Sequence, residues 1–185
     1  MRQTGVQMKI FYIFVLLLIV NSFATMIQAQ NPFFEKYNTP HQTVPFDKVK
    51  TEHYKSAITE GMRMHTAEID AITDNPDSPT FANTIVVYEK SGKLLEHVAT
   101  VFSNLHSAES NDEIQILAQE LMPMLSEHHN NINLNEKLFT RIKAVYEQRE
   151  KYNLTTEQTT LLNNIYDGFV RCGANLWDED KNKYR

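Results

Sequence analysis

Cysteine, glycine and proline are scarce in this sequence of 185 residues, which contains 1 Cys, 5 Gly and 6 Pro. A single cysteine, Cys172, excludes an internal disulfide framework and a cysteine-rich zinc module. So few turn-forming residues in a chain of this length favour long helices over many short strands. We therefore expect an all-α protein, folded as an antiparallel helical bundle.

A surplus of basic charge is also absent. The chain has 18 Lys and Arg against 23 Asp and Glu, which gives a formal net charge of -5. Proteins that bind nucleic acid neutralise phosphates with clustered Lys and Arg, so we expect no nucleic-acid partner. The apolar fraction of 42% is ordinary for a globular chain of one domain, or at most two small ones.

One long apolar run stands near the start of the chain. Arg2 and Lys9 precede the run Ile10–Val20, and Ala29 offers a small residue at a plausible cleavage point. This order is typical of a secretory signal peptide, and the run is shorter than the roughly 20 residues of a membrane span. We expect residues 1–29 to be a cleaved signal peptide, which implies an exported, periplasmic or secreted protein without a stable membrane span. An uncleaved anchor is the alternative.

Residues 30–50 are expected to form an extended leader, because prolines within it restrict the backbone and remove donors. From Thr51 the apolar residues recur at three- and four-residue steps, which predicts amphipathic helices. Their expected ranges are 51–72, 81–105, 112–132, 135–150 and 155–172. The phenylalanines that we expect to anchor the leader onto helices are Phe33, Phe34 and Phe46.

Several residues mark the expected helix ends and bends. Ser78 or Thr80 can cap the second helix, and Thr155 with Gln158 resembles a capping box for the fifth. Gly173 is a natural stop for that last helix. We expect the third helix to start near Ser110 or Asp112 and to be kinked at Pro123. At Gly92, the missing side chain would permit close approach of another helix. Acidic residues after Trp177 are typical of a further helix start.

The histidines do not form a recognisable metal-binding motif. No His-Glu dipeptide occurs in the sequence, so the HExxH motif of helical zinc proteases is absent. On a helix, the adjacent His128 and His129 point about 100° apart and cannot easily share one ion. His65 lies on an apolar helix face, where a partly buried, hydrogen-bonded side chain is expected. His97 and His106 face similar directions but lie two turns apart.

Other catalytic patterns are missing too. The sequence has no GxSxG elbow, phosphate loop or GxGxxG motif. Cys172 has no local nucleophile signature, and a half-buried structural thiol is the simpler interpretation. Asn153-Leu154-Thr155 matches a glycosylation acceptor, although helix capping explains it equally well. We expect no catalytic, cofactor-binding or metal-ligating residue in this chain.

The order of short motifs along residues 31–176 nevertheless resembles a known family. These motifs include Asn31-Pro32-Phe33-Phe34, Pro45-Phe46-Asp47, Glu52-His53-Tyr54, Pro79-Thr80-Phe81, Asn83-Thr84-Ile85-Val86, Ser91-Gly92, Lys137-Leu138-Phe139, Arg141-Ile142-Lys143-Ala144-Val145-Tyr146, Phe169-Val170-Arg171 and Gly173-Ala174-Asn175-Leu176. Together they resemble the N-terminal region of the thimet-oligopeptidase-like zinc metallopeptidases, in the peptidyl-dipeptidase (dipeptidyl carboxypeptidase) branch.

The resemblance implies a mostly helical peptidase that removes C-terminal dipeptides from short peptides within a deep channel. In that family, zinc is bound by HExxH and a Glu one helix later. This chain matches neither, so zinc is expected in the full-length family enzyme and none in this chain.

We therefore expect a partial peptidase. Residues 51–185 would be the N-terminal lobe that walls the channel, truncated before a catalytic domain that is its natural packing partner. The alternative is a stand-alone exported helical binding module without enzymatic activity, and a cysteine enzyme using Cys172 is a third hypothesis.

Overall fold

A computed structural model of the chain describes residues 31–109 and 111–175. The expected signal peptide, Ser110 and the segment after Trp177 lie outside these residues. The described residues contain helices and turns and no β-strand, which confirms the all-α class. They divide into two units, of which the first ends at Ala57 and the second begins at Ile58.

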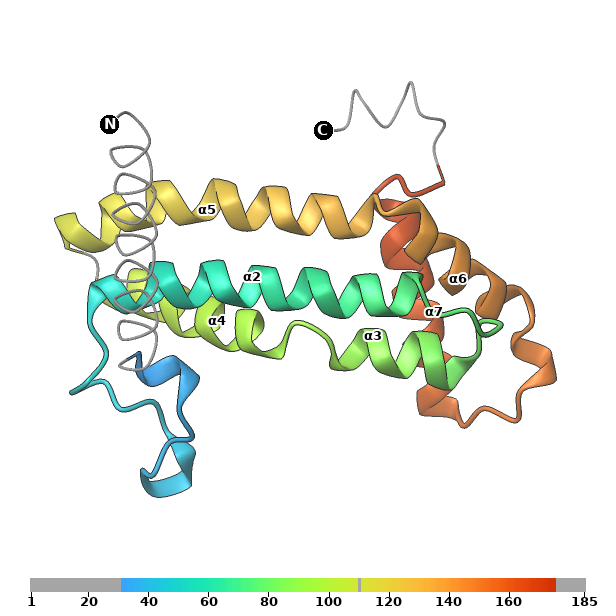
Figure 1. The fold of residues 1–185 in the computed structure, drawn as a ribbon, viewed down its shortest axis with the longest axis horizontal. Coiled ribbons are helices and arrows are strands. Elements are labelled where there is room, and N and C mark those ends of the chain that lie inside the picture. Colours follow the sequence, from blue (N-terminus) through green and yellow to red (C-terminus); the bar gives the residue numbers. More distant parts are fainter. Residues whose placement is uncertain (1–30, 110, 176–185) are drawn as a thin grey trace, which may run out of the picture. The chain divides into compact units, whose positions relative to one another are not determined.

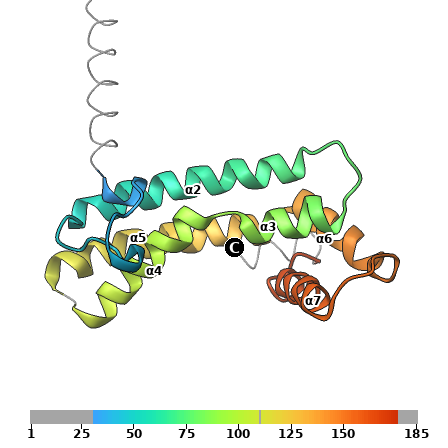
Figure 2. The same ribbon diagram turned by 90° about the horizontal axis from the view of Figure 1, so that it is seen from below.

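The helices of the structure follow the expected order closely (Figure 1). In the second unit, the chain runs along α2, returns along α3 and α4, and runs forward again along α5 (Figures 1 and 2). The α-helices are α2 (Thr51–Thr73), α3 (Val87–Lys90), α4 (Lys93–Ala108), α5 (Asp112–Asn133), α6 (Glu136–Glu147) and α7 (Thr156–Arg171). This alternation of direction is that of an antiparallel bundle.

The first unit is organised by the buried Asn31. Its Oδ1 accepts a hydrogen bond from the backbone N–H of Phe33, and its Nδ2 donates to the carbonyl of His53 and to Ser56 Oγ. Residues 31–50 are not uniformly extended, because 3₁₀ turns form at Pro32–Phe34 and Pro40–Gln42. Phe33 is buried against Tyr54, with ring centroids 5.2 Å apart, so it is an anchor as expected.

The expectation for Phe46 was wrong. Its side chain is 60% exposed, and it anchors nothing within the first unit. The chain forms a turn at Phe46. In this turn, the Phe46 N–H donates to the Val44 carbonyl and the Lys48 N–H donates to the Pro45 carbonyl. Pro45, not Phe46, is the buried residue of that motif.

The expected second helix, 81–105, is two helices in the structure. A π-helical turn, Phe81–Val86, leads into α3, and Thr80 caps it through a capping box with Asn83. The chain then breaks at Ser91 and Gly92, where Gly92 adopts φ 68° and ψ 16°. This left-handed conformation interrupts the helical hydrogen-bond ladder and suits glycine, and α4 starts afresh at Lys93.

The remaining helices confirm most sequence signals. Asn111 caps α5, which continues through Pro123 as one helix, and the kink expected at Pro123 stays a prediction. Asn135 caps α6, which ends at Glu147, three residues earlier than expected. Thr155 and Gln158 form the expected capping box at the start of α7. Gly173, at φ 84°, follows its last turn.

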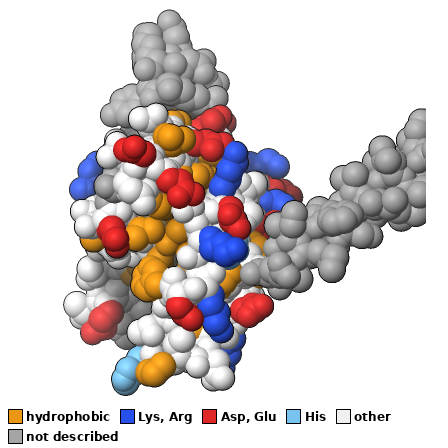
Figure 3. Space-filling view, turned by 90° about the vertical axis from the view of Figure 1, so that its left-hand side faces the viewer, with side chains coloured by type: hydrophobic (Ala, Val, Ile, Leu, Met, Phe, Trp, Pro, Cys, Tyr) orange, Lys and Arg blue, Asp and Glu red, His pale blue; other side chains and the backbone are white. Residues whose placement is uncertain are grey.

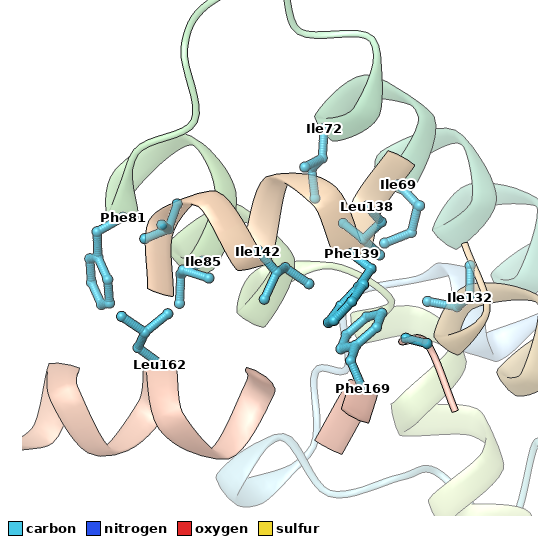
Figure 4. Packing of buried hydrophobic residues seen from close by; sticks show 12 residues of the cluster. Ile69, Ile72, Phe81, Ile85, Ile132, Leu138, Phe139, Ile142, Leu162 and Phe169 are labelled. Carbon is cyan, nitrogen blue, oxygen red and sulfur yellow. The ribbon is translucent and has the colours of Figure 1, made fainter. Parts of the chain in front are cut away.

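The main hydrophobic core lies where α6 and α7 pack against the end of α2 and the π-helical turn (Figure 4). Phe81, Ile85, Ile142 and Leu162 point toward one another, and Phe139 faces Phe169 with ring centroids 6.2 Å apart. These contacts are long-range, so the core joins elements from both ends of the second unit.

A second packing contact joins α2 to α4 at Gly61. A Cβ on Gly61 would lie 2.9 Å from the Cα of Leu95, so the two backbones approach closely here. The close approach expected at Gly92 also occurs, because a Cβ there would lie 3.0 Å from Nδ1 of His65 on α2, but Gly92 lies at the break between α3 and α4 and not inside a helix.

Some large apolar side chains remain at the surface. Figure 3 shows one face on which apolar side chains lie among acidic and basic ones. Among the described residues of the second unit, the large apolar residues with exposed side chains are Met64, Val87, Ile116 and Met122. None of the helices in the described part of the chain combines the length and apolar character that crossing a bilayer requires.

Candidate functional site

A pocket of about 520 Å³ lies in the second unit between α2, the break that separates α3 from α4, and α5. We call it the histidine pocket. Its lining residues are His65, Tyr88, Glu89, Ser91, Gly92, Lys93, Leu95, Glu96, Ala99, Leu125, His128, His129, Ile132 and Asn133. Leu95, Leu125 and Ile132 supply apolar walls, and the polar groups gather around two imidazoles.

The two imidazoles, of His65 on α2 and His128 on α5, are in direct contact. His65 Nδ1 lies 3.1 Å from His128 Nε2, and the ring centroids are 5.1 Å apart. This nitrogen–nitrogen distance is that of a hydrogen bond, so one ring donates and the other accepts. A ring that accepts through a nitrogen carries no proton there, and at least one imidazole of the pair is therefore neutral.

Ser91, in the break between α3 and α4, contacts the other ring nitrogen of His65. Its Oγ lies 3.3 Å from His65 Nε2 and 2.6 Å from the carbonyl oxygen of Tyr88, to which it donates. Since the hydroxyl has one proton and gives it to that carbonyl, it accepts from His65 Nε2–H in this arrangement. His65 then accepts at Nδ1, and His128 Nε2–H donates to it.

Gly92 brings the backbone against the His65 ring. A Cβ at this position would lie 3.0 Å from His65 Nδ1 and 3.1 Å from its Cγ. The Gly92 N–H donates to Glu68 Oε2 at 2.7 Å, which ties the break to α2. Both the left-handed backbone and the lack of space require glycine at this position.

Burial and the neighbouring imidazoles favour the neutral form of both rings. The pKa of His65 is lowered by desolvation first, and then by His128 and His129, while Glu68 opposes the shift. The pKa of His128 is lowered by desolvation and by His129. Burial also raises the pKa of the Tyr88 hydroxyl to about 12, with smaller contributions from Glu89 and Cys172.

Of the other histidines that the sequence singles out, His129 also lines the histidine pocket, whereas His97 and His106 do not. His129 is exposed on α5, next to His128. His97 is exposed on α4, and His106 stacks on Phe102 with centroids 6.3 Å apart. Cys172 is half-buried, as expected for a structural thiol.

The sequence prediction for His65 is confirmed, but its partner was missed. His65 is partly buried and hydrogen-bonded, yet His128 lies 63 residues away and no local spacing connects them. The available signal was that each histidine falls on an apolar face of its own helix. Among residues 31–109 and 111–175, no group of three or more His, Cys, Asp and Glu side chains is placed to hold a metal ion.

Comparison with known proteins finds sequence similarity to part of two kinds of peptidase. It is 41% identical over 155 residues to a dipeptidyl carboxypeptidase of Escherichia coli strain K12, covering 84% of this chain and 23% of the relative. A dipeptidyl carboxypeptidase of Salmonella typhimurium strain LT2 is 40% identical over 151 residues, or 82% of this chain and 22% of the relative.

More distant similarity extends to a second peptidase. Oligopeptidase A of Salmonella typhimurium strain LT2 is 21% identical over 154 residues, or 83% of this chain and 22% of the relative. No family model matches the chain. The chain thus spans less than a quarter of the length of the curated relatives it matches. By its sequence, this chain is a homologue of part of the dipeptidyl carboxypeptidases, as the order of its motifs predicts.

Proposed function

We propose that this chain is the N-terminal, non-catalytic helical lobe of a peptidyl-dipeptidase-like metallopeptidase. The observation that carries the proposal is the extent of the similarity, which covers 84% of this chain but only 23% of the dipeptidyl carboxypeptidase. The motif order supports the same assignment, because matching motifs occur in the same order from Asn31 to Leu176.

The residues of this chain do not fit the zinc of that family. The sequence contains no HExxH, and the described residues offer no set of three ligands. We therefore assign no hydrolytic step to this chain, and zinc would be bound by the remainder of a full-length enzyme. The role of the lobe would be to wall the substrate channel and admit short peptides, as the resemblance implies.

An exported location is part of the proposal. It is supported by Arg2 and Lys9 ahead of the apolar run Ile10–Val20, an order typical of secretory signals. Sequencing the N-terminus of the protein recovered from the periplasm or medium tests it. A mature protein that begins near Gln30 is expected, and a protein that retains residues 1–29 in the cytoplasm would refute export.

The absence of catalysis is tested with the purified 185-residue chain and a blocked tripeptide in the presence of zinc. We expect no release of dipeptide, whereas the Escherichia coli dipeptidyl carboxypeptidase serves as the active control. A mock purification from the same host reveals contaminating peptidase. Hydrolysis that exceeds this background and is abolished by a chelator would refute the proposal.

The lobe role is tested by mixing the chain with the part of the Escherichia coli relative that it does not match, expressed separately. A one-to-one complex in analytical ultracentrifugation is expected. A chain that stays monomeric, does not associate and unfolds in one cooperative transition would instead favour a stand-alone helical binding module.

A further inference from the structure

The contact between His65 and His128 lies outside anything that peptidase homology explains. It joins α2 to α5 across the histidine pocket, and Ser91 extends it to the break between α3 and α4. Three segments that are distant in sequence therefore meet at one pair of titratable rings. The hydrogen-bond partner of His65 Nδ1 is itself an ionisable imidazole, that of His128.

The geometry permits only some protonation states of the pair. With His65 Nδ1 and His128 Nε2 3.1 Å apart, a single proton lies between the two nitrogens. When both rings are protonated, both nitrogens are donors and neither can accept. Two positive charges would also face each other at that distance in a partly buried pocket, where screening by water is weak.

The charged groups around the pair do not remove this conflict. From α2, Glu68 faces His65, but its carboxylate accepts the Gly92 N–H. From α3 and α4, the pocket is lined by Tyr88, Glu89, Lys93 and Glu96, of which Lys93 and Glu96 pair with each other at 2.9 Å. From α5, His129 adds a further titratable ring of the same sign.

We propose that the His65–His128 pair is a pH-sensitive clasp, which holds α2 to α5 while at least one imidazole is neutral and releases them when both become protonated. Gly92 makes the clasp possible, because any Cβ there would displace the His65 ring. Release would loosen the walls of the histidine pocket and the junction of α3 with α4.

The direction of the pH effect follows from the lowered pKa of both histidines in the folded chain. A group whose pKa is lower in the folded state stabilises the fold above its unfolded pKa, and this stability is lost as pH falls toward the folded pKa. The ordinary histidine value is 6.5, so the loss begins near this pH. For each imidazole that stays neutral, the unfolding constant rises by up to about tenfold per pH unit below that value.

The clasp is tested by urea unfolding of the full 185-residue chain between pH 7.5 and pH 5. The wild type is expected to lose stability below pH 6.5, whereas the double variant His65→Gln/His128→Gln, which can still hydrogen-bond, should lose much less. His41→Asn removes an exposed histidine that does not line the pocket, at a left-handed backbone position that Asn tolerates, and should retain the wild-type profile. Equal pH dependence of the wild type and the double variant would overturn the clasp.

A second measurement uses only the wild type, in case the double variant does not fold. NMR of the ¹⁵N-labelled imidazoles at pH 7.5 should show His65 as the Nε2–H tautomer and His128 with a proton on Nε2. Amide hydrogen exchange near residues 65 and 128, corrected for its intrinsic pH dependence, should accelerate together as both rings become protonated. Two rings that titrate independently, without faster exchange, would overturn the proposal.

Discussion

At the scale of single residues, the structure gives two glycines quite different roles. Gly61 lies inside α2, where the absence of a side chain lets the Leu95 backbone of α4 approach. Gly92 instead adopts a left-handed conformation and is the N-cap residue of α4. A third glycine, Gly168 in α7, has nothing within 4 Å of its missing Cβ.

Gly61→Ala is therefore expected to destabilise the chain. The new Cβ would lie 2.9 Å from the Leu95 Cα, and overpacking of this kind costs about 1–3 kcal/mol. Gly168→Ala is the matched control, because its Cβ meets nothing and alanine is the better helix former by about 0.5–1 kcal/mol. Urea unfolding of both variants should give changes of opposite sign, and a stabilised Gly61→Ala would contradict the packing described.

A buried arginine also acts at this scale. Arg141 on α6 is 8% exposed, and its guanidinium donates to the carbonyls of Asn75 and Asp77 at 2.9 and 3.2 Å. These carbonyls belong to the loop between α2 and the π-helical turn, which has little regular structure of its own. Arg141 thus fixes a loop that the sequence marks only as a helix break, between Asn75 and Pro79.

At the scale of elements, helix starts are set by side-chain caps. Thr80, Asn111, Asn135 and Thr155 each accept a hydrogen bond from the backbone two or three residues into the helix that follows. Such caps satisfy donors that the helix itself leaves unpaired. Thr155 is also the last residue of the glycosylation acceptor pattern Asn153-Leu154-Thr155, and in the structure its side chain caps α7.

Thr155→Ala should destabilise α7 by about 1 kcal/mol, because the capping bond to the Gln158 N–H is lost. Thr160→Ala is the matched control within the same helix. Its hydroxyl only bonds back to the Thr156 carbonyl, and alanine favours the helix, so stability should stay equal or rise slightly. Circular dichroism during urea unfolding distinguishes them, and equal loss in both variants would argue against the cap.

At the scale of the whole molecule, the core of the second unit is built from long-range contacts. Ile69 and Ile72 of α2 meet residues of α6 and α7 that lie far along the chain. Beside this core, Tyr146 and Tyr166 stack with ring centroids 3.8 Å apart, and the Arg149 guanidinium lies 4.5 Å from the Tyr146 ring. The second unit thus has its own apolar core, while large apolar side chains such as Ile116 stay exposed.

Ile142→Ala should lower the free energy of unfolding by about 2–5 kcal/mol, because Ile142 is 0% exposed and its removal leaves a cavity between α6 and α7. Ile116→Ala, at a side chain that is 68% exposed, should change stability by no more than about 0.5 kcal/mol. The measurement is the urea midpoint with an unchanged slope. A similar small change in both variants would mean that the core is not cooperatively folded.

Much of this fold was predictable from local signals. The apolar spacing located every long helix, and Thr80, Thr155 and Gly173 were each identified as helix boundaries. The break at Gly92 was not predicted, because apolar residues continue on both sides at helical spacing. A glycine can adopt the left-handed conformation but need not do so, so its presence in the sequence does not predict a break. The contact with His65 shows why a residue without a side chain is needed at position 92.

The candidate site was less predictable than the fold. The sequence placed His65 on an apolar helix face, yet its contact with His128 depends on how α2 packs against α5. The spacing of apolar residues shows which face of a helix is buried, but it does not show which other helix packs against that face. The same holds for Gly61, whose neighbour Leu95 is known only once α2 and α4 are packed.

For this protein, residue order alone was sufficient to identify an all-α chain, its helix caps and its similarity to part of a peptidase. These depend on hydrogen bonds and side-chain preferences that act within a few residues, or on motif order along the chain. The pairing of two histidines 63 residues apart, the close approach at Gly61 and the arginine-fixed loop were decided by tertiary packing. These residues are far apart in the sequence, so interactions within a few residues do not determine the distance between them, and only the packing of the helices does.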